Sequence, residues 1–167
     1  MVAYLETIRG VLNHKVPAGL NSHPMIASKE VLFTETAGAG VYTGSVVVPA
    51  GANIIDIQVR STALWTAATS STMQVGDVGN AAGWYTGINL AAIDLLVGEV
   101  IRFSSTGGKE GVYIVNLSGL LSAGYNAAAV TISGRITTVG GAGVAGRTRM
   151  LVLYAPAWYS AANATKV

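Results

Sequence analysis

Apolar and polar residues alternate along short segments of this chain from residue 30 onward, and Gly, Pro, Asn and Ser separate the segments. A period of two is typical of a strand that buries one face. In the segment 54–60, three apolar residues are predicted to face the core and three polar residues to face solvent. The apolar residues are Ile55, Ile57 and Val59, and the polar residues are Asp56, Gln58 and Arg60.

Further strands are predicted at 31–34, 45–48, 72–76, 99–103, 111–115, 130–136 and 147–155. Another element begins at Gly83-Trp84-Tyr85, the stretch 89–96 holds a short helical turn, and Gly107-Gly108 is predicted to turn a hairpin into 111–115. The last strand, 147–155, is apolar on both faces, so it is expected at a sheet centre or a subunit contact. About eight to ten short strands with no long helical pattern predict an all-β fold, a jelly-roll-like β-sandwich.

Residues 1–29 are predicted to be an N-terminal arm, and residues 30–167 the β-sandwich domain. Leu5, Ile8 and Leu12 have helical spacing and predict a short helix near the start of the arm. The following segment, 14–28, contains Pro and Gly and cannot build a core of its own. It is either a disordered tail or an extended arm that gains order against a partner. Its apolar side chains favour the arm; they are Val16, Leu20, Met25 and Ile26.

Only 11% of the residues are charged, against roughly 25% in an average soluble domain. Interface cores are depleted of charge, so this deficit favours a surface that faces other subunits. The alternative is an ordinary β-protein coated with Ser, Thr and Gly.

The basic residues are scattered singly along the chain, and the net charge is only +2. A nucleic-acid site needs clustered basic residues, and the nearest approach is Arg147 with Arg149 on one strand face. The longest uncharged stretch, 111–134, is interrupted by Asn and Gly, which predicts strands and a loop, not a membrane helix. Neither nucleic acid nor a membrane is therefore expected as a partner. The chain has no cysteine, which excludes disulfides and thiolate metal sites and fits a cytosolic assembly site.

Gly141–Gly146 matches the dinucleotide-binding fingerprint in its letters, but that motif needs a helix after its glycines. Here a predicted strand follows. Both histidines, His14 and His23, lie in the arm, away from any scaffold that would hold a catalytic triad. No catalytic residue, cofactor site or metal site is predicted, and the chain is expected not to be an enzyme.

The carboxylates offer two weaker possibilities. Asp77 and Asp94 beside Trp84 and Tyr85 form the best candidate for sugar chemistry, but Asp77 is expected to shape a turn and the aromatics to lie in the core or an interface. Asp77 with Asn80 offers too few oxygen ligands for calcium, which takes six to eight.

The order of several motifs resembles that of the small β-sandwich virion proteins of tailed bacteriophages, especially capsid decoration (cement) proteins. The motifs are Ser45–Val59 with its Val-Pro-Ala-Gly turn, Thr72–Asp77, Gly83–Tyr85 and Gly98–Phe103. The resemblance spans roughly residues 30–155 and implies a homotrimer that binds the major capsid protein on the outer surface of the virion. It implies no catalytic residue.

The sequence thus predicts a structural virion protein that stabilises a phage head by adhesion. The predicted capsid or subunit contacts are Val16, Leu20, Met25, Ile26, Trp84, Tyr85 and Trp158. The alternative is a carbohydrate-binding or tail-fibre-type receptor-binding module. It would stack sugar rings on Trp65, Trp84, Tyr85 or Trp158.

Overall fold

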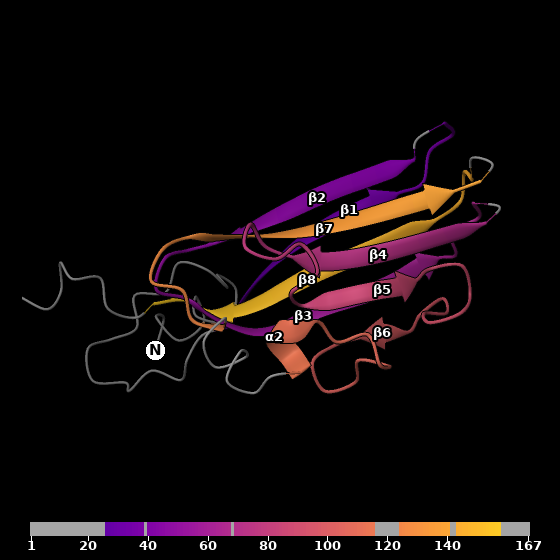
Figure 1. The fold of residues 1–167 in the computed structure, drawn as a ribbon. Coiled ribbons are helices and arrows are strands. Elements are labelled where there is room, and N and C mark those ends of the chain that lie inside the picture. Colours follow the sequence, from indigo (N-terminus) through magenta and orange to yellow (C-terminus); the bar gives the residue numbers. More distant parts are fainter. Residues whose placement is uncertain (1–25, 39, 68, 116–123, 141–142, 158–167) are drawn as a thin grey trace, which may run out of the picture.

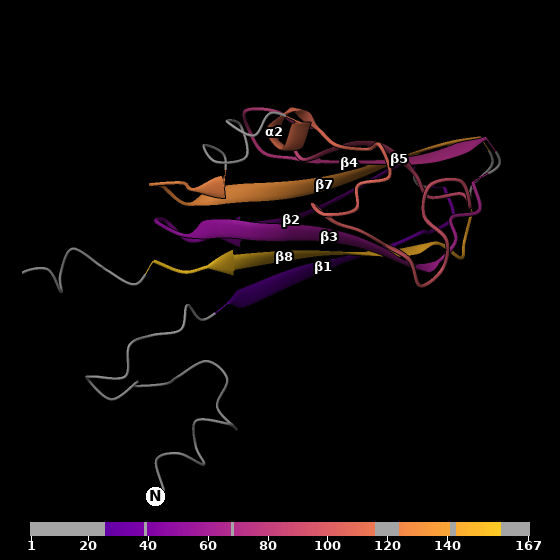
Figure 2. The same ribbon diagram turned by 90° about the horizontal axis from the view of Figure 1, so that it is seen from below.

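The computed structural model describes residues 26–38, 40–67, 69–115, 124–140 and 143–157. They form two antiparallel four-stranded sheets, packed as the two layers of a sandwich (Figures 1 and 2). The described ranges contain almost no helix, and the predicted all-β sandwich is confirmed.

We name the sheets after their first strands. The β1 sheet has the order β1-β8-β3-β6, with β1 (Ala27–Thr34), β8 (Arg147–Ala155), β3 (Asn53–Ala63) and β6 (Val100–Ile101). The β2 sheet has the order β2-β7-β4-β5, with β2 (Val41–Val48), β7 (Val130–Val139), β4 (Ser70–Gly76) and β5 (Tyr85–Asn89).

Strand β8 has the bounds predicted from its apolar run, and it lies between β1 and β3. Its apolar residues on both faces therefore mark a central strand. Strand β1 begins at Ala27, where it pairs with Tyr154. The last three residues of the predicted arm, 27–29, thus form the start of the first strand.

The predicted facing of β3 is wrong at Ile55. The pairing of β3 with β8 shifts register between Ile54 and Asp56, which is the mark of a β-bulge. Ile54 is consequently buried in the core, whereas Ile55 is 42% exposed. Beyond the bulge Ile57 and Val59 face the core as predicted.

The strand predicted at 111–115 is also wrong, because Val112–Val115 forms the short helix α2. The chain does turn at Gly107 and Gly108, which both have positive φ, and the Lys109 N–H donates to the Thr106 carbonyl at 3.1 Å. The turn leads into a helix, so the predicted hairpin is not formed. At 112–115 the packing of the segment overrides the β propensity of its residues. The Tyr113 N–H bonds to Gly83 O, and the Tyr113 ring lies edge-on to Trp84 with centroids 5.3 Å apart.

The core between the sheets depends on a glycine pair in the β2 sheet. Gly44 and Gly134 are cross-strand partners on the inner face. A Cβ on Gly134 would lie 2.7 Å from Phe33 Cζ and 2.9 Å from Met73 Cε, and one on Gly44 would lie 2.6 Å from a Val31 methyl. The glycines therefore make the space into which β1 inserts the Phe33 ring.

The strand order places the loops at two opposite ends. Ile26 and Ala157, where the described chain starts and stops, lie at one end, since Ala27 pairs with Tyr154 (Figure 1). The loops after β1, β3, β5 and β7 lie at the other end. No helix among the described residues is both long and apolar enough to cross a membrane.

Candidate interaction surfaces

The residues predicted as contacts have different positions. Val16, Leu20, Met25 and Trp158 lie outside the described residues. Ile26 is described and is 61% exposed, so it is available for contact.

The prediction that Trp84 and Tyr85 make capsid or subunit contacts is wrong, because both side chains are fully buried. The Trp84 ring stacks on Phe103 with centroids 5.3 Å apart, and the Tyr85 hydroxyl donates to the Ile57 carbonyl at 2.6 Å. Burial, with a smaller contribution from the negative charge of Asp56, raises the pKa of Tyr85. Trp65 is buried as well, and its Nε1 donates to the Thr148 hydroxyl. Three of the four predicted sugar-stacking platforms are therefore core residues.

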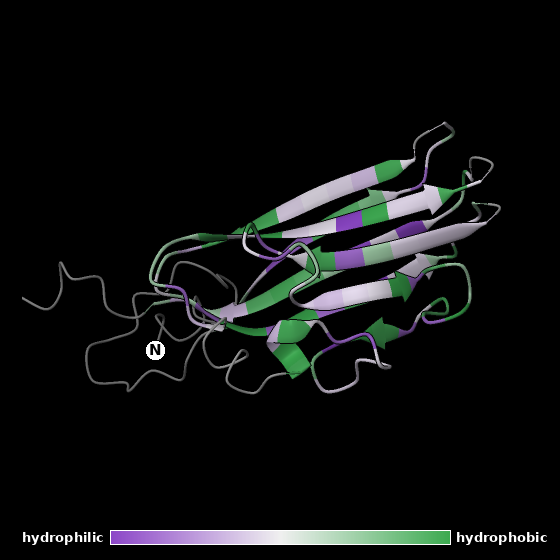
Figure 3. Ribbon diagram, viewed as in Figure 1, coloured by the Kyte–Doolittle hydropathy of each residue, from purple (hydrophilic) through white to green (hydrophobic). Residues whose placement is uncertain are grey.

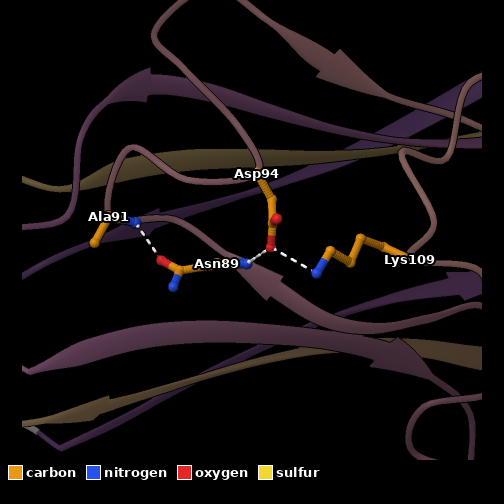
Figure 4. Close-up of polar contacts among 4 residues, drawn as sticks. All are labelled: Asn89, Ala91, Asp94 and Lys109. Carbon is orange, nitrogen blue, oxygen red and sulfur yellow. Dashed lines mark hydrogen bonds and ion pairs between the residues drawn. The ribbon is translucent and has the colours of Figure 1, made fainter.

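The two carboxylates considered for sugar chemistry hold loops. Asp94 Oδ2 accepts the Asn89 N–H at 2.7 Å and pairs with Lys109 Nζ at 2.9 Å, while Asn89 Oδ1 accepts the Ala91 N–H (Figure 4).

Asp77 Oδ1 accepts the backbone N–H groups of Gly79 and Asn80, which confirms its predicted role in the turn. It also accepts the Tyr113 hydroxyl at 3.2 Å, and burial together with the charge and hydrogen bond of Asp77 raises the pKa of Tyr113. Within the described ranges, no group of three or more His, Cys, Asp or Glu side chains is placed to hold a metal ion.

A buried carboxylate that the sequence did not reveal, Glu35, joins three loops between the two sheets. Its Oε2 accepts the N–H and hydroxyl of Thr66 at 3.0 Å, the Gly146 N–H at 2.9 Å and the Ala145 N–H at 3.3 Å. Burial alone would raise the pKa of Glu35, but these hydrogen bonds together lower it below its ordinary value. Glu35 follows β1, Thr66 lies between β3 and β4, and Gly146 precedes β8, so a single side chain fixes three crossovers.

The outer face of the β1 sheet carries charge. The strands of this sheet contain six charged residues: Lys29, Glu30, Asp56, Arg60, Arg147 and Arg149. Five of them point outward, whereas Lys29 lies on the same side of β1 as Val31 and Phe33, and its Nζ reaches the Val47 carbonyl of strand β2. Arg60 and Arg149 are direct cross-strand partners, and Arg149 Nη2 contacts both carboxylate oxygens of Glu30 at 2.6 and 2.7 Å. This ion pair is about half exposed, so water solvates much of it.

The outer face of the β2 sheet is almost without charge. Arg135 is the one charged residue in its four strands. Figure 3 shows strongly hydrophilic colour only on short segments of β7 and β4 in this sheet. Most of the outward positions carry small hydroxyl or amide side chains: Thr43, Ser45, Ser70, Thr72, Gln74, Thr131, Ser133 and Thr137. Half-exposed valines, Val41, Val47 and Val139, flank them.

This hydroxyl-rich face is slightly hollowed beside the turn after β4. The turn packs directly on Gly76, where a Cβ would meet the Asn80 and Ala81 backbone. Between the turn and strands β2 and β7 lies an open hollow of about 420 Å³. Its lining has no aromatic side chain and consists of Thr43, Gly44, Ser45, Asp77, Ala81, Ser133, Gly134 and Arg135.

No protein-family model matches the chain, and no curated protein matches it. Among solved structures it is similar to a chain of the capsid asymmetric unit of cyanophage Pam1, with a TM-score of 0.47 and 20% identity over 87% of this chain and 97% of that chain. It is also similar to a chain of the capsid of Ralstonia phage GP4, with a TM-score of 0.37 and 17% identity over 90% of this chain and 94% of that chain. Neither likeness assigns a function to this chain.

Proposed function

We propose that this chain is a structural virion protein, a jelly-roll subunit that binds the outer surface of a phage head and stabilises it as a decoration or cement protein. The strand order supports the jelly roll, because among the strands that the structure describes only β4 and β5 are consecutive and share a sheet. Each of the other pairs of consecutive described strands is divided between the two sheets. The motif order noted in the sequence supports the class of virion protein.

The outer face of the β2 sheet is the observation that carries the proposal. A face whose strands carry one charge and many small hydroxyl side chains loses little hydration energy when a partner covers it. Small hydroxyls also find hydrogen-bond partners by rotation, without ordering a long side chain. The β2 sheet is therefore the proposed capsid-facing surface, and the charged β1 sheet faces solvent.

The remaining parts of the proposal follow from adhesion as the mechanism. The protein works as a homo-oligomer on the major capsid protein, without a cofactor and without catalysis. The segment that precedes β1 adds contact area on a neighbouring subunit, starting from the exposed Ile26. Many weak contacts repeated over a shell give avidity, so no single contact needs to be strong.

The test is a binding measurement on shells built from the major capsid protein of the same phage without this chain. We expect the purified protein to co-sediment with expanded shells, to saturate at a fixed ratio, and to raise the temperature at which the shells open. A protein that stays in the supernatant at every concentration, with shells no more stable than before, would refute the proposal. Soluble glycans added in excess serve as the control, because a sugar-binding module would be competed off and a cement protein would not.

A further inference from the structure

Among the strands that the structure describes, β2 is an open edge of its sheet and lacks the usual protection. Natural edge strands are blunted by charged side chains, proline or bulges, because their free backbone groups recruit other strands. The edge strand β1 has Lys29 and Glu30, and the edge strand β6 is only two residues long. Strand β2 is eight residues long and has neither a charge nor a proline.

The pairing of β2 with β7 shows which of its backbone groups point outward. The Thr138 N–H donates to Gly40 O at 2.9 Å, and residues 40, 42, 44 and 46 therefore bond toward β7. The odd-numbered residues point their N–H and C=O groups away from the sheet. Val47 agrees, because its carbonyl accepts Lys29 Nζ at 2.7 Å. Val41, Thr43 and Ser45 thus present a row of donors and acceptors along the edge that pair with no other described strand.

The order of side chains on this edge is self-complementary. Reading along the outer face, the residues are Val41, Thr43, Ser45 and Val47, with Gly44 at the midpoint. If a second copy of β2 lies antiparallel across a two-fold axis at Gly44, each Val41 meets Val47 and each Thr43 meets Ser45. All four outward residues then fall in hydrogen-bonded pairs, the half-exposed valines cover each other, and no like charges meet.

We propose that β2 is a homodimerisation edge, at which two copies of the chain join their β2 sheets into one continuous eight-stranded sheet with Thr43 opposite Ser45 of the second copy. Lys29 moderates this association, because its ammonium group occupies one of the outward carbonyls. The contact joins copies of the chain to each other, so it does not rest on the proposed shell binding, and its test uses no shells.

The decisive test uses cysteine pairs, which the cysteine-free chain allows. Thr43→Cys and Ser45→Cys are purified separately and oxidised alone or mixed. In the proposed register, the mixed pair has Cα atoms about 5.5 Å apart, within disulfide range, whereas each variant alone places its cysteines about 7–8 Å apart. We expect the covalent dimer in the mixture and little in either variant alone. No cross-link, or equal cross-linking in all three samples, would overturn the proposal.

The association state provides the second measurement. Native mass spectrometry of the wild type is expected to show an even number of subunits. Ser45→Lys should raise the dimer dissociation constant roughly tenfold or more, because two ammonium groups meet across the axis. The matched control is Ser133→Lys, on the cross-strand partner of Ser45 in the central strand β7. Its two charges lie roughly 14 Å apart in the dimer, beyond the screening length, and leave it intact.

Lys29→Ala should tighten the dimer. A wild type of one or three subunits, or equal effects of the two lysine variants, would contradict the proposal.

Discussion

The two sheets share one core but differ in their outer faces. The strands of the β1 sheet carry six charged residues, and the strands of the β2 sheet, of similar total length, carry one. Folding does not require this difference, because both sheets bury the same kind of inner face. The difference in charge gives the molecule one outer face that is strongly hydrated and one that can lose its bound water at a low cost in free energy. Within the two sheets, the deficit of charge therefore belongs to the β2 sheet and not to the β1 sheet.

The largest effect is expected when one carboxylate is placed on the outer face of each sheet in turn. Thr131→Glu puts a charge at an exposed position of β7 in the β2 sheet, and Thr34→Glu puts one on β1 opposite Arg147. A charge buried without a partner costs several kcal/mol, so Thr131→Glu should weaken shell binding about 100-fold or more. Thr34→Glu should bind like the wild type. Equal binding by both variants in the co-sedimentation assay would show that the β2 sheet does not face the shell.

The next largest effect concerns the packing of the two sheets against each other. Gly134→Ala should lower the free energy of unfolding by about 2 kcal/mol, because the added methyl would overlap Phe33 and Met73. Gly40→Ala is the matched control. Its Cβ would have Thr138 O at 3.9 Å as its nearest neighbour, and its effect should stay within about 0.5 kcal/mol. Urea denaturation followed by Trp fluorescence measures both, and similar losses would mean that Phe33 does not need the glycine pair.

Glu35 tests what holds the crossovers between the sheets. Glu35→Gln should lower the free energy of unfolding by about 1–2 kcal/mol. The glutamine amide loses the interactions of the carboxylate, and its NH2 group gains no hydrogen-bond acceptor in exchange. The folded pKa of Glu35 lies below its unfolded value, so the unfolded chain binds the proton more readily. Its stabilisation is present above the ordinary Glu pKa of 4.5 and is lost as the pH falls through the folded pKa. When thermal unfolding is measured from pH 7 down to pH 3, the melting temperature of the variant should fall less steeply with pH than that of the wild type.

The smallest expected effect comes from the ion pair on the β1 sheet. Arg149→Ala should change stability by less than about 1 kcal/mol, because Glu30 and Arg149 are both about half exposed and the change also relieves the repulsion between Arg149 and Arg60. The difference should shrink further in high salt. A loss of several kcal/mol in denaturant titrations would mean that this face is structural and not merely solvated.

Apolar residues that alternated or ran together predicted most of the strands, but the apolar run at 112–115 is a helix. The bounds of β8 and its central place followed from its two apolar faces. Ile55 was misassigned because a β-bulge shifts the period by one residue without a signal in the local pattern. Residues 112–115 were misassigned because β-branched residues favour a strand, and the packing of Tyr113 on Gly83 and Trp84 is not visible in the sequence.

The candidate surface was less accessible from the sequence. Trp84 and Tyr85 were predicted as contacts or core, and only the three-dimensional packing separates these possibilities. The hydroxyl-rich face left a partial signal in the alternate Thr and Ser residues of β2 and β7. Its extent depends on the register that aligns Ser45 with Ser133. The Glu35 junction joins groups 31 and 111 residues away along the chain, and no short motif encodes such a junction.

The arrangement of the two ends of the sandwich also suits the molecule to display. The described chain starts at Ile26 and stops at Ala157 at one end, and the loop between β5 and β6 lies at the other (Figure 1). That loop exposes Ile93, Leu96 and Val97. An epitope or enzyme inserted there would project away from Ile26 and Ala157, and the β2 sheet between the two ends of the sandwich would remain uncovered. A head coated with such subunits would present the insert as a dense, regular array.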